Sequence, residues 1–303
     1  MNAELKIAGL GETLWDILPS GPQLGGAPTN FACIAQQLGA KAYVVSCVGA
    51  DGFGRDAEKA LLKRGVSTDY LFKHPNLPTG KVKVTLDEQG IPSYDIEKEA
   101  AWDHLPCPDS LIAFARQLDA VSFGVLSQRS PDSRRAIRSV LDNMPKDSLR
   151  ILDVNLRAPY YTKELVTESL EYANILKVSD EELPVLADYY QLEGEVTMQL
   201  RQLLERFDLK LLAYTRGANG SILLNDHQAS MARALPVIPL NAVAAGDSFI
   251  GALTVALLSG YSLHESNRLA NRVAAYVCSH QGPTPALPPE FRIVSAIETA
   301  RAA

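Results

Sequence analysis

Asp247 is the residue of this chain that is best placed to act as a base. The apolar residues after it recur at spacings of three and four, which predicts a helix over residues 247–259 with one buried face. Three small residues, Ala244, Ala245 and Gly246, come immediately before it. A helix N-terminus carries unpaired N–H groups and the positive end of the helix dipole, and both stabilise a developing phosphate charge. A carboxylate beside such an anion site can accept the proton of an attacking hydroxyl, so this segment suggests phosphoryl transfer to an alcohol.

A second segment with chemical potential, residues 25–30, reads Gly-Gly-Ala-Pro-Thr-Asn and precedes a predicted helix. The pair Gly25 and Gly26 lets the backbone approach a ligand closely, and the Asn30 amide offers donors and an acceptor to hydroxyl groups. Both segments also have a structural explanation. Asp in a first helical turn complements the dipole, and glycines with proline form ordinary turns. Taken alone, neither segment decides between the two explanations.

Further polar residues follow predicted strands, which is where open α/β sheets place their ligands. Arg157 comes after a strand over residues 150–154 and is either a ligand contact or a solvated loop cation. Ser179 and Glu182 follow a strand over residues 175–178 and have the spacing of a capping box. Glu182 could also hold metal-bound water, and the two interpretations are compatible.

The composition is that of an ordinary globular protein of 303 residues, with 47% hydrophobic and 21% charged residues and a net charge of −6. No block of basic residues is present, which argues against nucleic acid as a partner. No apolar run approaches the roughly 18 residues of a membrane span. The first residues do not resemble a secretory signal, so we expect a cytoplasmic protein. The four cysteines form no CxxC pair and the five histidines show no metal-ligand spacing, which predicts buried free thiols and no zinc site.

The order of predicted elements indicates the fold class. Strands are expected at residues 5–10, 42–48, 120–125, 150–154, 175–178, 209–215 and 221–224, and helices at 27–38, 53–64, 247–259, 263–279 and 290–301. A period-two pattern at 81–86 and 93–97, around a turn at 87–90, predicts a hairpin with one polar face, and residues 12–18 could add a strand to it. The chain is therefore expected to form an α/β fold, a doubly wound, mostly parallel sheet flanked by helices, with a small projecting β-sheet lid. We expect one domain over residues 1–303, with lid segments at about 12–22 and 78–104 inserted in it.

These segments, in this order, resemble the PfkB sugar-kinase family, which is also called ribokinase-like. The first signature of that family is similar to residues 25–39, a glycine-rich segment to residues 48–54, and the second signature to residues 241–249. Within the family, residues 11–16 and 100–103 resemble the bacterial fructokinase branch. The resemblance covers nearly the whole chain.

The resemblance implies a role for each matching residue. Asp247 would be the base, and the backbone of Ala244, Ala245 and Gly246 would form the anion hole. The sugar hydroxyls would be contacted by Asp16, Gly26, Asn30 and Arg157. The residues along ATP and its Mg²⁺ would be Lys177, Glu182, Thr215, Gly217, Gly220 and Asn271, with Glu182 holding the metal through water.

The second signature departs from the family pattern at three positions. Asn241 replaces an Asp that often helps to bind a monovalent cation, Ala242 removes a hydroxyl, and Ala244 places a Cβ where glycine would tolerate positive φ. The leading hypothesis is an ATP-dependent kinase that converts fructose to fructose 6-phosphate, forming a homodimer through the lid. The alternatives are a 2-keto-3-deoxygluconate kinase or another sugar kinase of the family, and a degenerate protein that binds sugar or nucleotide without catalysis.

Overall fold

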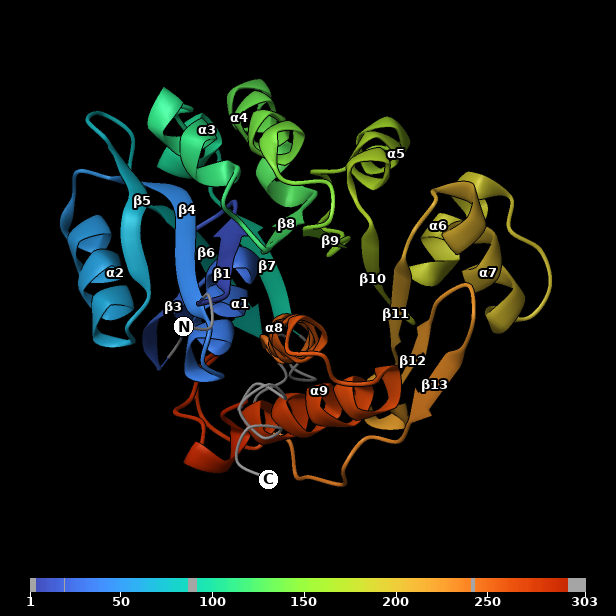
Figure 1. Cartoon of the computed structure of the whole chain (residues 1–303). Coiled ribbons are helices and arrows are strands. Elements are labelled where there is room, and N and C mark those ends of the chain that lie inside the picture. Colours follow the sequence, from blue (N-terminus) through green and yellow to red (C-terminus); the bar gives the residue numbers. More distant parts are fainter. Residues whose placement is uncertain (1–3, 19, 87–91, 241–242, 294–303) are drawn as a thin grey trace.

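A nine-stranded sheet forms the centre of the computed structural model, which describes residues 4–18, 20–86, 92–240 and 243–293 (Figure 1). In spatial order its strands are β13 (Ala229–Ala232), β12 (Ser221–Leu224), β11 (Leu211–Thr215), β10 (Ile175–Ser179), β9 (Leu149–Asp153), β8 (Ala120–Gly124), β1 (Lys6–Leu10), β4 (Lys41–Gly49) and β5 (Ser67–His74). Neighbouring strands from β11 to β5 run parallel, whereas β12 pairs antiparallel with both β11 and β13. The prediction of a mostly parallel sheet is confirmed.

Most strands of this sheet are largely apolar, and helices bury both of its faces. The helices on one face are α3 (Asp109–Ala115), α4 (Pro131–Asn143), α5 (Lys163–Tyr172), α6 (Leu183–Tyr190) and α7 (Val196–Arg206). Those on the other face are α1 (Ala27–Gln37), α2 (Gly52–Lys63), α8 (Ala245–Leu258) and α9 (Leu263–Cys278). In Figure 1, α8 and α9 lie on the side of the sheet opposite α3, α4 and α5. The doubly wound architecture is therefore confirmed.

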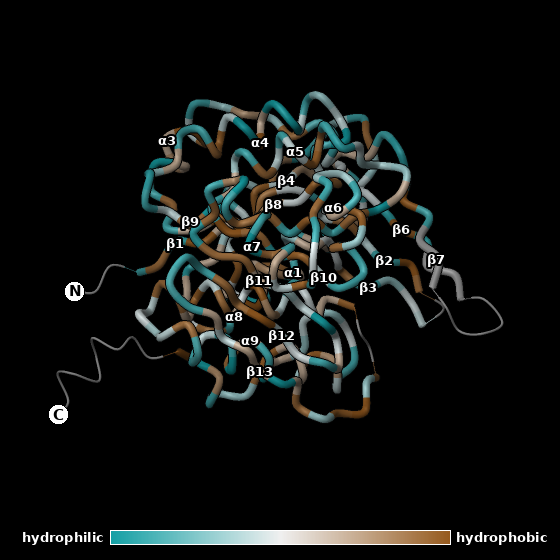
Figure 2. Tube along the Cα trace, turned by 90° about the vertical axis from the view of Figure 1, so that its right-hand side faces the viewer, coloured by the Kyte–Doolittle hydropathy of each residue, from teal (hydrophilic) through white to brown (hydrophobic). Residues whose placement is uncertain are grey.

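A separate four-stranded sheet has the order β3 (Gly21–Gly25), β2 (Leu14–Leu18), β6 (Gly80–Leu86) and β7 (Pro92–Ile96). Figure 2 shows these strands together at one side of the molecule. β6 and β7 pair antiparallel as the predicted hairpin requires, and residues 12–18 do contribute a strand. The predicted turn at 87–90 lies outside the described residues.

Three strands were not predicted, because their sequences carry only a weak strand pattern. β3 contains two glycines and Pro22, which are poor strand formers, but β3 is an edge strand and an edge tolerates proline. β5 and β13 are the two edges of the large sheet and are largely solvated, so their apolar patterns are weak. The predicted helix at 290–301 is wrong at its start, where Pro289–Phe291 form a 3-10 turn, and residues 294–301 lie outside the described residues.

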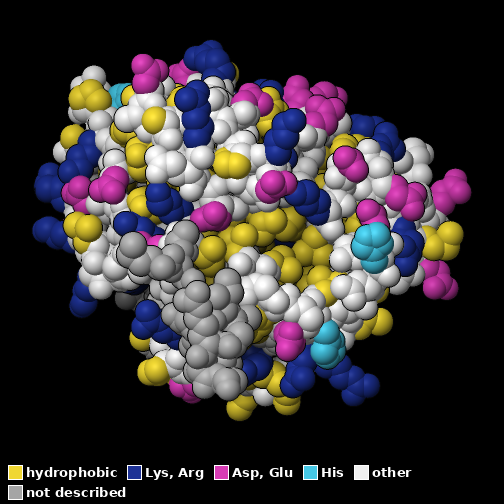
Figure 3. All heavy atoms as spheres, viewed as in Figure 1, with side chains coloured by type: hydrophobic (Ala, Val, Ile, Leu, Met, Phe, Trp, Pro, Cys, Tyr) yellow, Lys and Arg dark blue, Asp and Glu magenta, His cyan; other side chains and the backbone are white. Residues whose placement is uncertain are grey.

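All four cysteines are free, but the prediction that they are buried holds fully only for Cys33 and Cys47, since Cys107 is exposed and Cys278 partly so. No helix within the described ranges has the length and apolar character needed to cross a membrane. On the face drawn in Figure 3, acidic and basic side chains are interspersed around a hollow lined by hydrophobic side chains. That face offers no continuous basic surface.

Candidate active site

The helix α8 begins where the sequence predicts. The residue before it, Ala244, adopts a backbone conformation that is unfavourable for any residue other than glycine. The helix begins at Ala245 and Asp247 lies in its first turn. Ala244, the residue before the helix, has φ of 63° and ψ of 10°, which is the left-handed conformation. A non-glycine residue there costs on the order of 1–2 kcal/mol, so the Cβ at this position is strained as expected. Asn241 and Ala242, the other two departures, lie outside the described residues.

Asn30 and Asp247 meet directly although they are 217 residues apart in the sequence. The Asn30 Nδ2 donates a hydrogen bond of 2.9 Å to the Asp247 Oδ2. The contact exists because α1 and α8 pack closely. A Cβ added at Gly251 of α8 would lie 3.0 Å from the Ile34 side chain of α1. The two segments singled out from the sequence therefore form one site.

The surroundings of Asp247 favour its protonated form. The pKa of Asp247 is raised from 3.8 to about 7, mainly by burial and also by the nearby carboxylates of Asp153 and Glu12. The hydrogen bond from Asn30 and the charge of Lys177 act in the opposite direction. A carboxylate with a pKa near the working pH is suited to accept a proton during a reaction, because it is neither too weak a base nor already protonated.

Lys177 brings a fixed positive charge to the same helix terminus. Its Nζ lies 2.9 Å from the Asp153 Oδ1 and 3.8 Å from the Glu182 Oε2. Although burial acts against the charge, the carboxylates of Asp153 and Glu182 raise the pKa of Lys177, which keeps it protonated. A Cβ added at Gly246 would lie only 3.2 Å from this Nζ, so the ammonium group sits against the first turn of α8. The Lys177 ammonium and the N–H groups of the first turn of α8 therefore lie at the same point of the site.

Glu182 makes the two reciprocal bonds expected of the predicted capping box, but they close a turn ahead of α6, which begins at Leu183 with Glu182 as its N-cap residue. The Ser179 N–H donates to the Glu182 Oε2 at 2.8 Å, and the Glu182 N–H donates to the Ser179 Oγ at 3.3 Å. The Leu156 N–H donates to the Glu182 Oε1 at 3.2 Å. Although burial would raise it, the charge of Lys177 and these hydrogen bonds lower the pKa of Glu182, so the side chain is a carboxylate. Each carboxylate oxygen has two acceptor positions, which leaves capacity to bind a metal-bound water.

The glycine-rich loop before α1 is held by Glu12, a residue that the sequence analysis missed. Gly26 has φ of 102°, and a Cβ there would lie 2.4 Å from the Glu12 carbonyl oxygen, so only glycine fits. The Ala27 N–H donates to the Glu12 Oε1 at 3.1 Å, and the Ser127 hydroxyl donates to the other carboxylate oxygen. Glu12 follows the buried strand β1 and Gly11, and a carboxylate at the end of such a strand is a sequence signal for a site residue.

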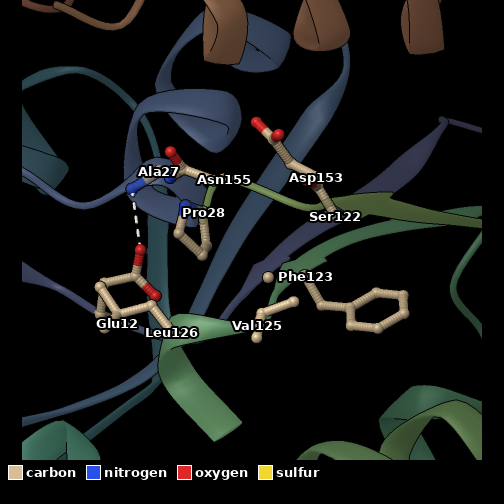
Figure 4. Close-up of a pocket in the computed structure, with 10 residues that line it drawn as sticks. Glu12, Ala27, Pro28, Ser122, Phe123, Val125, Leu126, Asp153 and Asn155 are labelled. Carbon is tan, nitrogen blue, oxygen red and sulfur yellow. Dashed lines mark hydrogen bonds between the residues drawn. The ribbon is translucent and has the colours of Figure 1, made fainter. Parts of the chain in front are cut away.

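Figure 4 shows Glu12 and Asp153 on the wall of a small cavity at the carboxyl ends of β1, β8 and β9. The cavity measures about 10 Å³ and its lining also includes Pro28, Ser122 and Asn155. This volume holds about one water molecule, and the carboxylates and the amide provide polar partners for it. The carboxyl ends of the parallel strands are thus the polar edge that the sequence predicted.

Asp16 and Arg157 approach the site from two different sheets. Asp16 lies in β2 of the small sheet, and Arg157 follows β9 of the large one. Burial raises the pKa of Asp16 to about 6, and the positive charge of Arg157 partly opposes this rise. The two side chains are therefore electrostatic neighbours, and both are partly buried.

The remaining predicted residues gather around the turn between β11 and β12. Thr215 ends β11, and its carbonyl accepts the Asp180 N–H at 2.9 Å, which joins it to the end of β10. Gly217 and Gly220 form the turn, and both have positive φ. Asn271 of α9 donates its Nδ2 to the Ser221 Oγ at 2.7 Å, so it adjoins the same turn. A cavity of about 420 Å³ lined by Arg216, Asn219, Met231, Ala232 and Arg233 lies beside it.

Comparisons with known proteins identify the family of the chain. The family model described as "pfkB family carbohydrate kinase" matches residues 22–290. The chain belongs to the pfkB family of carbohydrate kinases. An uncharacterized sugar kinase of Pyrococcus horikoshii is 30% identical over 85% of this chain and 81% of its own. A probable fructokinase of Arabidopsis thaliana is 29% identical, with 96% of each chain covered.

Solved structures of pfkB kinases share the fold. The Pyrococcus horikoshii protein superposes with a TM-score of 0.81 at 28% identity, covering 92% of this chain and 93% of that one. A fructokinase of Xylella fastidiosa with bound ATP gives a TM-score of 0.83 at 22% identity, covering 93% and 95% of the two chains. The fold class expected from the sequence, a ribokinase-like α/β fold with a small second sheet, is confirmed by these likenesses.

Proposed function

We propose that this pfkB carbohydrate kinase transfers the γ-phosphoryl group of ATP to the primary hydroxyl at C6 of fructose, giving fructose 6-phosphate. Fructose is favoured because several relatives that match over nearly their full length are named fructokinases. The observation that carries the proposal is the Asn30–Asp247 contact of 2.9 Å at the start of α8. It brings a base and a polar amide to the positive end of a helix.

In this proposal, Asp247 accepts the proton of the attacking hydroxyl as the new O–P bond forms. The bond between the γ-phosphorus and the β–γ bridging oxygen breaks, and ADP leaves. The N–H groups around Ala244, Ala245 and Gly246 stabilise the transferred phosphoryl, and the Lys177 ammonium 2.9 Å from Asp153 adds positive charge there. Asp16, Gly26, Asn30 and Arg157 hold the sugar hydroxyls.

The nucleotide would lie along Thr215, Gly217, Gly220 and Asn271, and Glu182 would hold Mg²⁺ through a water molecule. Among the residues that the structure describes, no group of three or more His, Cys, Asp or Glu side chains could hold a metal by itself. This fits Mg²⁺, because that ion keeps several waters and is held by one or two carboxylates together with substrate phosphates. Bound Mg²⁺ would neutralise charge on the phosphates.

The small sheet is the proposed lid of a single kinase domain over residues 1–303, formed by segments at about 12–22 and 78–104. Its closure would exclude water from the site and limit the hydrolysis of ATP in the absence of sugar. The proposal includes a cytoplasmic location and a homodimer that pairs through this sheet.

The test is a panel of sugars assayed with ATP and Mg²⁺, in which ADP release is measured and the product is identified by ³¹P NMR. We expect fructose to give the highest kcat/KM and a 6-phosphate product. Preference for 2-keto-3-deoxygluconate would replace fructose with that acid, for which the Arg157 cation is a suitable partner. Sugar or nucleotide binding without turnover would refute catalysis and identify the chain as a degenerate binding protein.

A further inference from the structure

A buried ion pair outside the proposed catalytic groups connects the small sheet to the large one. The Arg129 Nε and Nη2 donate to the two carboxylate oxygens of Asp103 at 2.8 and 2.7 Å. The side chains are only 9% and 6% exposed, respectively. Arg129 follows a short 3-10 turn at Leu126–Gln128, just after β8 of the large sheet. Asp103 belongs to another 3-10 turn, Ala101–His104, which comes after β7.

Two aromatic rings enclose the Arg129 guanidinium. Its central carbon lies 4.1 Å from the ring centre of Trp102 and 4.6 Å from that of Tyr160. A planar guanidinium stacks on such rings while its edge donates hydrogen bonds, which an ammonium group cannot reproduce. The geometry therefore uses properties that are specific to arginine.

This cluster holds both ends of the β6–β7 hairpin. The Arg129 Nη2 donates to the Glu97 carbonyl oxygen at 2.6 Å, and the Tyr160 hydroxyl donates to the Ile96 carbonyl oxygen at 2.9 Å, at the end of β7. At the start of β6, Gly80 lies against Trp102, because a Cβ there would be 2.4 Å from the indole Nε1. The hairpin is thus fixed at its base to Arg129 and Tyr160 of the main body, and packs there against Trp102, which follows it in the chain.

The same cluster reaches a proposed sugar contact. The Tyr160 N–H donates to the Arg157 carbonyl oxygen at 2.8 Å, so the turn that carries Arg157 also carries the ring that stacks on Arg129. Movement of the Arg129 side chain would therefore affect two things together: the orientation of the small sheet and the position of the Arg157 turn.

Stability alone does not explain why a charged pair occupies this position. Burying two charges costs desolvation energy, and apolar residues of similar volume often replace such pairs without loss of stability. In addition, the Arg129 Nη1 is buried without a hydrogen-bond partner in the described part of the chain, which adds to the cost. What the pair supplies is a fixed geometry, because a bidentate, stacked guanidinium allows little variation in angle or distance.

We infer that Arg129 is a positioning residue that holds the small sheet and the Arg157 turn in the orientation needed to bind the sugar. This inference rests on the proposed sugar-kinase function. Arg129 touches neither the reacting groups nor the nucleotide residues, so its loss should weaken sugar binding and leave ATP binding unchanged.

The test compares the wild type with Arg129→Lys and with the double variant Arg129→Met/Asp103→Asn, which removes both buried charges together. Two quantities are measured: the KM values for sugar and ATP, and hydrogen exchange of the backbone amides of β6 and Glu97 without ligands. We expect both variants to fold, the sugar KM to rise by about tenfold or more, and the ATP KM to stay within about twofold. Exchange in β6 should rise, and hydrolysis of ATP without sugar should rise relative to sugar phosphorylation.

Arg138→Met is the matched control. Arg138 also pairs with a carboxylate, Glu168 at 2.5 Å, and lies 5.6 Å from the ring centre of Tyr172, but these contacts join α4 to α5 and do not involve the small sheet. It should change neither KM nor exchange in β6. Unchanged sugar KM or unchanged exchange in a folded Arg129→Lys protein overturns the inference, as does an equal rise of both KM values. If the wild type phosphorylates no sugar, the proposed function fails, and the exchange experiment still decides whether Arg129 holds the sheet.

Discussion

Asp247→Asn should lower turnover and at the same time stabilise the protein. Asparagine keeps the shape of the side chain but cannot accept a proton as a base. We expect kcat to fall by roughly 10²–10⁴ with the fold intact. The stability effect follows from the pKa of Asp247, which burial raises from 3.8 to about 7.

The sign and the size of the stability effect can be worked out from that shift. A carboxyl group with a raised pKa in the folded state is harder to ionise there than in the unfolded chain. Its ionisation therefore destabilises the fold above pH ~4, increasingly up to about pH 7, and by a constant amount above it. A shift of about three units corresponds to at most about 4 kcal/mol. Asp247→Asn should recover much of this at pH 8 and little near pH 4.

Chemical denaturation of the wild type and the variant at pH 5 and pH 8 measures this difference, and steady-state turnover at each pH measures the catalytic one. For the wild type, kcat/KM should fall about tenfold per unit below pH ~7, because Asp247 becomes protonated in the free enzyme. The control is Asp109→Asn, since Asp109 lies in the first turn of α3 and is exposed. Near-normal turnover of Asp247→Asn, or a stability gain no larger at pH 8 than at pH 5, would refute the reasoning.

Three further predictions concern Arg157, Ala244 and the response to potassium. Arg157→Ala should raise the sugar KM far more than the ATP KM, measured by steady-state kinetics, and a selective rise of the ATP KM would assign Arg157 to the wrong ligand. Ala244→Gly should raise the free energy of unfolding by about 1 kcal/mol, measured by denaturation, because glycine relieves the backbone strain at φ 63°; a loss of stability would contradict this. Potassium should activate the enzyme weakly or not at all when turnover is measured with and without the ion. The Asn241→Asp variant should respond more strongly, because an amide lacks the charge of a carboxylate. Strong activation of the wild type would contradict this prediction.

Much of the fold follows from local patterns. The buried strands β1, β4, β8, β9 and β10 are near-continuous apolar runs, so periodicity and length identify them without tertiary information. The strands that were missed, β3, β5 and β13, lie at sheet edges, where one side faces solvent and the sequence carries less apolar signal. Their existence depends on a neighbouring strand with free hydrogen-bonding groups, which no local pattern records.

For the candidate site, too, some properties are local to the sequence and others depend on the folded chain. Local sequence identifies the reactive groups: a carboxylate after small residues at Asp247, an amide at Asn30, and the Ser179–Glu182 spacing of a capping box. The folded chain adds that Asn30 lies 2.9 Å from Asp247, and that burial with neighbouring carboxylates raises the pKa of Asp247 to about 7. It also revealed Glu12 beneath the glycine loop. Residue types are local properties, whereas distances, desolvation and charge neighbours depend on which distant segments pack together, so these appear only when the chain is folded.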